Sequence, residues 1–177
     1  SNLERASDLI KSFKQVAVDQ TSLETCKIML HRYLEEVITS LRPKLKRCPH
    51  SVWLDTVIND IQIETEPGAL AQVVTNLVLN ATIHAYPENY EETGTITVTI
   101  SAVPNAVEIV VSDDGRGIPD KNLGKIFDPF FTTRGGQGGT GLGLHIVHNI
   151  VTSRLGGTIE CRSEVGRGTD FVISLPS

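Results

Sequence analysis

The sequence predicts a fold of the α/β class, and two patterns carry the prediction. In the segments 70–85 and 142–151, apolar residues recur every three or four positions, as on the buried face of a helix. In Thr95–Ile100 and Val107–Val111, apolar and polar residues alternate, as on a half-buried strand. The chain has 177 residues, of which 40% are hydrophobic and 21% charged, a composition typical of one globular domain.

The net charge, the lengths of the apolar runs and the cysteines indicate which partners and which cellular compartment the protein is suited to. A net charge of -5 argues against nucleic acid as a partner, because phosphate backbones select basic faces. The sequence has no run of about 18 apolar residues and no signal-peptide pattern. Its three cysteines are scattered and include no Cys-x-x-Cys pair, which favours a reducing compartment over a disulfide framework. These features predict a cytoplasmic domain, with or without a membrane anchor elsewhere in its parent.

The first predicted element is a helix over 3–17. Its apolar residues have the 3.5-residue spacing of a helix that packs lengthwise on other helices: Leu3, Ala6, Ile10, Phe13 and Ala17. A polar break follows at 19–22. We interpret residues 1–20 as the end of a helical hairpin and residues 21–177 as the main domain, the alternative being a helix packed on that same domain.

The next elements alternate between strand and helix. A short strand is predicted at Cys26–Leu30, followed by an amphipathic helix from Tyr33 to Leu45 that tolerates Pro43. Ser51–Leu54 and Ile61–Glu64 indicate two further strands. Pro67 suits the first turn of a helix whose core stripe is Leu70, Val73, Val74, Leu77, Ala81 and Ala85.

The second half of the chain contains two hairpins around one helix. Pro104-Asn105 supplies the turn of the first hairpin, which should deliver Asp113 to the edge of the sheet. The helix after Leu142 should stop near Gly156-Gly157. The second hairpin pairs Thr158–Cys161 with Thr169–Leu175.

A polar stripe runs beside the core stripe of the helix after Pro67. Its members, Gln72, Asn76, Asn80 and His84, are four residues apart and share one face. Amides have low helix propensity and are unusual beside a packed core unless they bind something. Taken alone, the stripe is more often explained by solvation or by capping of a neighbouring strand. An Asn oxygen is a suitable Mg²⁺ ligand, and Asn80 is the candidate.

Three further motifs follow. In Asp113-x-Gly115-x-Gly117, a carboxylate at a strand end can accept a hydrogen bond from an amine, although such a motif alone is often only a turn. Phe127–Arg134 contains three Phe and one Pro, and the alternative for it is a loop held to the core by its aromatic residues. Segment 135–143 contains six glycines and leads into a helix, where free backbone N–H groups bind phosphate. A disordered linker is the alternative for this segment.

The four motifs in series resemble the ATP-binding catalytic domain of sensor histidine kinases, in the GHKL superfamily that includes gyrase and MutL. Residues 72–85 resemble the family's N box, 113–117 its first glycine box, 127–134 its F box and 139–144 its second glycine box. Gly168-Thr169-x-Phe171 resembles the motif that closes the adenine pocket. The resemblance covers about Leu23 to Leu175. It implies a Bergerat-type two-layer sandwich, a mixed, mostly antiparallel sheet with helices on one face and an ATP lid between Asp113 and Leu144.

By this resemblance, ATP and Mg²⁺ are the expected ligands. Asp113 should bind the adenine amino group, with Thr169 nearby, and Asn80 should ligate Mg²⁺. The residues expected to act in catalysis are Asn76, Asn80 and Arg134. Those expected to contact the nucleotide are Asn80, His84, Asp113, Gly115, Gly117, Ile118, Phe131, Thr132, Thr133, Gly139, Thr140, Gly141, Leu142, Gly143, Leu144 and Thr169.

The resemblance also implies an activity, transfer of the ATP γ-phosphate to a histidine on the dimerisation hairpin of a homodimeric parent, for relay to a response-regulator aspartate. The acceptor belongs to the hairpin's first helix, and none of the five histidines here fits it. Asn76 stands where ATP-hydrolysing relatives carry a Glu that activates water. Ile83 stands where many relatives carry a basic residue, which keeps a weakly active scaffold open as an alternative, beside a serine kinase or ATPase. The glycine-rich lid is expected to be disordered without nucleotide.

Overall fold

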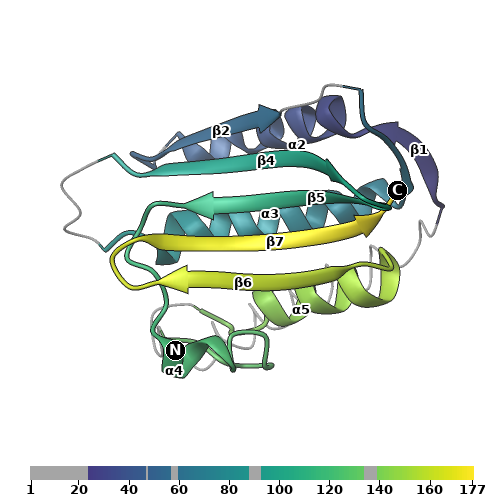
Figure 1. The fold of residues 1–177 in the computed structure, drawn as a ribbon. Coiled ribbons are helices and arrows are strands. Elements are labelled where there is room, and N and C mark those ends of the chain that lie inside the picture. Colours follow the sequence, from purple (N-terminus) through teal and green to yellow (C-terminus); the bar gives the residue numbers. More distant parts are fainter. Residues whose placement is uncertain (1–23, 47, 57–59, 88–92, 134–138) are drawn as a thin grey trace.

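The protein has two layers, a five-stranded sheet and a layer of helices against one of its faces (Figure 1). The computed structural model describes residues 24–46, 48–56, 60–87, 93–133 and 139–177. The sheet has the order β2-β4-β5-β7-β6, and the helices are α2, α3 and α5. Their bounds are β2 Ser51–Thr56, β4 Thr95–Val103, β5 Ala106–Asp113, β6 Thr158–Glu164, β7 Gly168–Pro176, α2 Leu30–Leu45, α3 Pro67–His84 and α5 Gly143–Asn149.

The sheet is mixed and mostly antiparallel, which confirms the predicted fold class. Strand β2 runs parallel to β4, whereas the pairs β4–β5, β5–β7 and β6–β7 are antiparallel. Two short strands, β1 (Cys26–Met29) and β3 (Gln62–Thr65), form a separate antiparallel pair. Both predicted hairpins are present, and Asn105 takes a left-handed conformation (φ 60°) in the first turn.

Asp113 is not at the lateral edge of the sheet, contrary to the sequence-based expectation. It is the last residue of β5, which is the central strand, and it is paired with Ile96 of β4 and Thr169 of β7. The prediction failed because alternation within a hairpin does not reveal that a strand from the end of the chain pairs on the hairpin's other side. As a result, Asp113 is flanked by two strands and is largely withdrawn from water.

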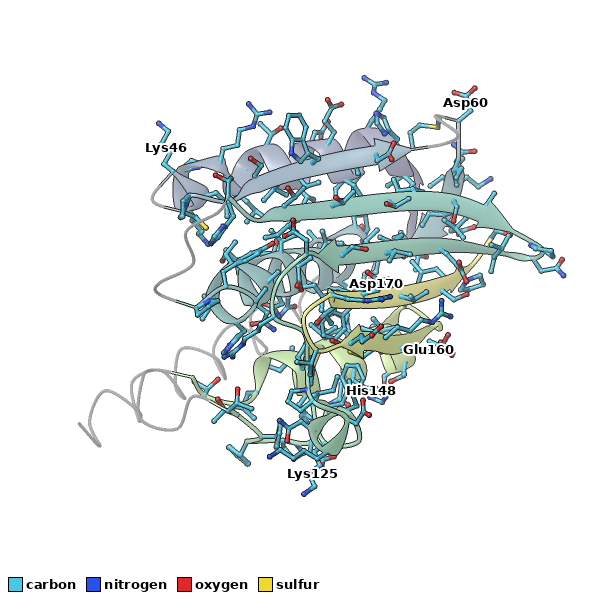
Figure 2. The ribbon with its side chains drawn as sticks, turned by 60° about the vertical axis from the view of Figure 1, so that its left-hand side comes forward. Lys46, Asp60, Lys125, His148, Glu160 and Asp170 are labelled. Carbon is cyan, nitrogen blue, oxygen red and sulfur yellow. The ribbon has the colours of Figure 1, made fainter. Side chains whose placement is uncertain are left out.

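The core lies between the sheet and the helices. Figure 2 shows charged side chains such as those of Lys46 and Lys125 pointing outwards from the molecule. The predicted stripe of α3 is buried throughout, from Leu70 to Ala85, and it faces the inward side chains of the central strands. These side chains alternate with outward ones along each strand, as the pleat requires. The inward residues of β4, β5 and β7 are Ile96, Val98, Ile100, Val107, Ile109, Val111, Phe171, Ile173 and Leu175.

Helix α5 continues directly into a π-helical turn, η2 (Ile150–Arg154), and ends before Gly156, which adopts a φ of 66°. The predicted helix stop is therefore confirmed. A short helix, α4 (Asp120–Leu123), was not predicted, because four residues are too few to show a period. The predicted helix over 3–17 lies outside the described residues. No helix within the described ranges has both the length and the apolar character needed to cross a membrane.

Candidate functional site

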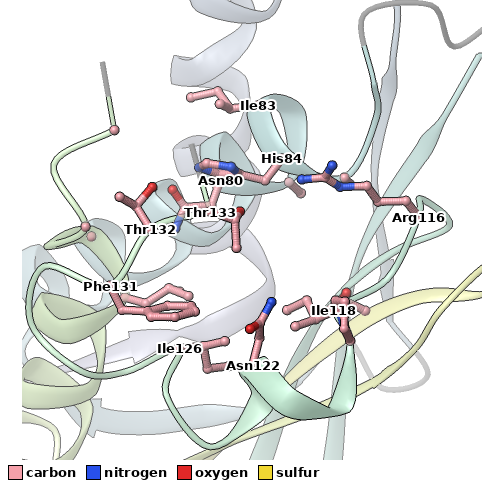
Figure 3. Close-up of a pocket in the computed structure, with 18 of the residues that line it drawn as sticks. Asn80, Ile83, His84, Arg116, Ile118, Asn122, Ile126, Phe131, Thr132 and Thr133 are labelled. Carbon is pink, nitrogen blue, oxygen red and sulfur yellow. The ribbon is translucent and has the colours of Figure 1, made fainter. Parts of the chain in front are cut away.

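One cavity of about 730 Å³ lies between the end of α3, the loop after β5, α4 and the start of α5. Its volume is within the range of roughly 300–1,000 Å³ that is usual for small-molecule sites. Figure 3 shows side chains from α3, from the loop after β5 and from the segment around Phe131 arranged about this cavity. The predicted residues that line it are Asn80, His84, Asp113, Ile118, Phe131, Thr132, Thr133, Gly139, Thr140, Gly141, Gly143, Leu144 and Thr169.

Asp113 lies at the sheet end of the cavity. Burial, together with the neighbouring carboxylates of Asp114 and Asp170, raises the pKa of its carboxyl to about 6. Two backbone N–H groups, those of Gly115 and Thr169, oppose this shift, and the Gly115 nitrogen is 3.0 Å from Asp113 Oδ1. At neutral pH the result is a partly desolvated carboxylate that faces the cavity as a hydrogen-bond acceptor.

The raised pKa predicts a pH-dependent stability of the unliganded protein. Because the folded-state pKa exceeds the unfolded value, the contribution of Asp113 is fully present below about pH 4. It is lost as the pH rises through about 6. The free energy of unfolding, measured by urea denaturation, should therefore fall between about pH 4.5 and about pH 7.5 relative to that of Asp113→Asn, which does not titrate. Parallel profiles for the two proteins would contradict this prediction.

The opposite end of the cavity is formed where α3 meets the start of α5. A Cβ on Gly143 would lie 3.5 Å from Asn80 Nδ2 and 3.7 Å from Asn80 Oδ1, so the carboxamide of Asn80 lies directly beside the helix start. Gly141 has a φ of 68°, and a Cβ there would be 2.4 Å from the Phe130 carbonyl carbon. The two glycines thus leave backbone exposed to the cavity, at a helix end whose dipole favours anions.

Several predicted site residues are not on the cavity wall. Asn76, Leu142, Gly115 and Gly117 do not line it, and Arg134 lies outside the described residues. The two glycines of the Asp113 motif were expected to pass close to a ligand. Instead they pass close to other backbone, since a Cβ would lie 2.3 Å from Ala85 O at Gly115 and 2.2 Å from Glu164 O at Gly117.

The sequence analysis also missed residues that do line the cavity. Arg116 and Lys121 bring positive charge to the wall, on the loop after β5 and on α4. Arg116 occupies an unspecified position of the Asp113 motif and Lys121 lies outside every motif, so neither residue had a signal in the sequence. The other missed residues are mostly apolar and close the walls: Ala81, Ile83, Ala85, Pro119, Asn122, Ile126 and Val165.

A network behind the cavity fixes the end of α3 to the sheet. The Tyr86 hydroxyl donates to Asp114 Oδ1 (2.7 Å), and the Thr95 N–H donates to the same oxygen (2.8 Å). The His50 ring stacks on Tyr86 with ring centroids 3.8 Å apart. Burial and the Asp114 hydrogen bond raise the pKa of Tyr86, so the hydroxyl keeps its proton. Asn80 and Asp113 are therefore held on elements that are joined directly behind the cavity.

Residues 65–177 match the family described as histidine kinase-, DNA gyrase B- and HSP90-like ATPase. Among curated proteins, the sensor histidine kinase ZraS of Escherichia coli K12 is 45% identical over 115 residues. That match covers 65% of this chain and 23% of ZraS, so the chain spans less than a quarter of this relative's length.

Two solved structures of the histidine kinase ThkA are also similar. Its nucleotide-free catalytic domain has a TM-score of 0.73 and 32% identity, covering 86% of this chain and 95% of that chain. ThkA in complex with the response regulator protein TrrA has a TM-score of 0.74 and 26% identity, covering 97% of this chain and 48% of that chain. Each of the two likenesses therefore extends over most of this chain.

Proposed function

The chain belongs to the family of histidine kinase-, DNA gyrase B- and HSP90-like ATPases, and we propose that it is the ATP-binding catalytic domain of a two-component sensor histidine kinase. The observation that carries the proposal is one cavity with a partly buried carboxylate at one end and a glycine-lined helix start at the other. This pairing matches a nucleotide, whose base offers an amine and whose other end carries phosphates.

At the base end, the carboxylate of Asp113 would accept a hydrogen bond from the adenine amino group, which is a charge-assisted bond in a partly dry site. Thr169 lines the same end. Apolar side chains beside them, among them Ile118, Ile126 and Phe171, form walls that suit a flat ring. Burial of the base against these walls would position the rest of the nucleotide.

At the phosphate end, backbone N–H groups from Gly141 to Gly143 would receive the phosphates at the start of α5. The donor set there fits Mg²⁺, because the Asn80 carboxamide lies beside the helix start and Mg²⁺ usually takes few protein ligands together with phosphate oxygens. Among described residues, no group of three or more His, Cys, Asp or Glu side chains could hold a metal by itself. When bound, Mg²⁺ would neutralise phosphate charge. Arg116 and Lys121 would contribute to this neutralisation, because Ile83 occupies the position at which many relatives carry a basic residue.

This arrangement suits transfer to a histidine better than transfer to water. Asn76 lies one turn before Asn80, and an amide cannot act as the general base that hydrolysis requires. An imidazole is itself a nucleophile, so a kinase needs positioning and charge neutralisation. The γ-phosphate would pass to a histidine outside this chain and then to a receiver-domain aspartate; the ThkA–TrrA complex supports this partner.

The acceptor histidine and the receiver contact would come from other parts of the parent protein. We assign residues 1–20 to the end of the dimerisation hairpin and residues 21–177 to the catalytic domain, and we expect a homodimeric parent with this domain in the cytoplasm. Arg134, at the expected lid hinge, is a candidate for the γ-phosphate contact.

The proposed function predicts that this chain, mixed with a helical hairpin carrying the acceptor histidine, transfers label from γ-labelled ATP with Mg²⁺ to a histidine. The label should be stable to alkali and labile to acid, as a phosphohistidine is. Steady ATP hydrolysis without a labelled histidine would instead place the chain among the ATPases. Nucleotide binding with neither reaction would favour a scaffold.

A further inference from the structure

Ser163 lies beneath the base end of the cavity and has three polar neighbours. It is on β6, directly opposite Thr169 in the register of the β6–β7 pair. Its Oγ is 2.8 Å from the Ile118 nitrogen, 2.8 Å from the Gly168 carbonyl oxygen and 2.8 Å from Thr169 Oγ1. Ser163 does not line the cavity itself, whereas Thr169 does.

The chemistry of these neighbours fixes the direction of each hydrogen bond. The Ile118 N–H can only donate, so Ser163 Oγ accepts it. The Gly168 carbonyl can only accept, so it receives the single proton of Ser163. No proton of Ser163 is left for Thr169, and the Thr169 hydroxyl must therefore donate to Ser163. This arrangement uses one donated and two accepted bonds, the full capacity of a hydroxyl.

The direction of this last bond determines what Thr169 offers to a ligand. With its proton committed to Ser163, the Thr169 oxygen presents only lone pairs to the cavity. Asp113 is paired with Thr169 in the β5–β7 register, and Gly168 allows this close approach because a Cβ there would be 1.9 Å from Asp113 O. The base end thus presents two acceptors side by side.

We propose that Ser163 is a positioning residue that sets base selectivity by holding the Thr169 hydroxyl as an acceptor. An adenine amino group has two protons and can satisfy both Asp113 and Thr169. A 6-oxopurine places an oxygen there, which the fixed Thr169 hydroxyl cannot bind. This inference rests on the proposed nucleotide function and adds a residue that touches no ligand.

The test compares the affinities of ADP and IDP, which differ in the amino and oxo groups of the base, by calorimetric titration with Mg²⁺. Wild type should prefer ADP. In Ser163→Ala the Thr169 hydroxyl is free to rotate and to donate to the oxo group, so the ADP/IDP affinity ratio should fall about fivefold, the worth of one ordinary hydrogen bond. Ser163→Thr keeps the hydroxyl and should restore the ratio.

A double-mutant cycle with Thr169→Val separates positioning from general support of the fold. If Ser163 acts through Thr169, then Ser163→Ala should leave the ADP/IDP ratio of Thr169→Val unchanged. Ser174→Ala, which removes a hydroxyl from β7 away from the cavity, is the matched control and should leave the wild-type ratio unchanged. Thr169→Val alone should also lower the ratio. A wild-type ratio in Thr169→Val would overturn the inference even if Ser163→Ala folds poorly, because Ser163 can act only through a Thr169 that contributes to selectivity.

Two outcomes would overturn the inference. If wild type prefers ADP but Ser163→Ala weakens both nucleotides by the same factor, Ser163 only supports the strand pair and the proposed function survives. If wild type binds neither nucleotide, the proposed function fails and this inference fails with it.

Discussion

Changing Asp113 to Asn is expected to weaken nucleotide binding by about 30- to 150-fold, which corresponds to about 2–3 kcal/mol for a hydrogen bond to a charged group. The reason lies in the contacts that the carboxylate already makes. Asp113 Oδ1 accepts the Gly115 N–H at 3.0 Å. In the Asp113→Asn variant the single amide oxygen would have to serve this N–H, and the amide nitrogen would then face the adenine amino group, donor against donor.

The measurement is a calorimetric titration of wild type and Asp113→Asn with a non-hydrolysable ATP analogue and Mg²⁺. Asp170→Asn is the matched control, because it removes the same charge from the neighbouring strand at a residue that does not line the cavity. The control should bind within about twofold of wild type, as expected for a screened charge outside the site. Equal affinity of wild type and Asp113→Asn, with both proteins folded, would mean that Asp113 does not hold the base.

The parts of the fold that follow from local patterns could be predicted from the sequence. The start of α3 at Pro67, its buried stripe and both hairpins depend on residues a few positions apart. The parallel pairing of β2 with β4 has no such local signal, because β3 and α3 intervene between the two strands. Likewise, nothing near Asp113 in sequence indicates that β7 covers its second side.

In the site, too, the residues with a local sequence signal could be predicted, whereas those placed by long-range contacts could not. Asn80 and Asp113 could be singled out because an amide on a core helix and an acid at an apolar strand end are unusual in themselves. The glycines at 115 and 117 were given a ligand role, yet they approach Ala85 and Glu164, which are distant in sequence. Arg116 lies between these glycines, and its place on the cavity wall depends on the same long-range contacts.

An ion pair at the far end of the helices is the second feature with a large expected effect. Glu66, whose side chain is 5% exposed, binds Arg154 through two bonds, one of them 2.9 Å from Arg154 Nε to Glu66 Oε2. The two residues are 88 positions apart in the sequence. Glu66 precedes α3 and Arg154 ends η2, so each charge also suits the dipole of its own helix.

This pair joins the two helices whose opposite ends form the phosphate side of the cavity. The rise along α3 from Glu66, its N-cap, to Asn80 is about 21 Å, and α5 with η2 returns from Gly143 to Arg154 over about 16 Å. Together with the apolar packing between the helices, the contact at one end therefore helps to set how the Asn80 carboxamide meets Gly143 at the other. Loss of the pair should lower nucleotide affinity as well as stability.

Changing Arg154 to Leu is expected to lower the free energy of unfolding by about 3–5 kcal/mol, because it leaves the buried Glu66 carboxylate without its partner. Arg162→Leu is the matched control: its pair with Glu160 is 3.2 Å long but both side chains are about two-thirds exposed, so its loss should cost at most about 1 kcal/mol. Urea denaturation measures both changes. The double change Glu66→Leu with Arg154→Leu should recover much of the loss, since no unpaired charge then stays buried. If Arg154→Leu lowered the free energy of unfolding no more than Arg162→Leu, the energetic role assigned to the buried pair would be wrong. Apolar packing between α3 and α5 alone would then hold the geometry of the phosphate end.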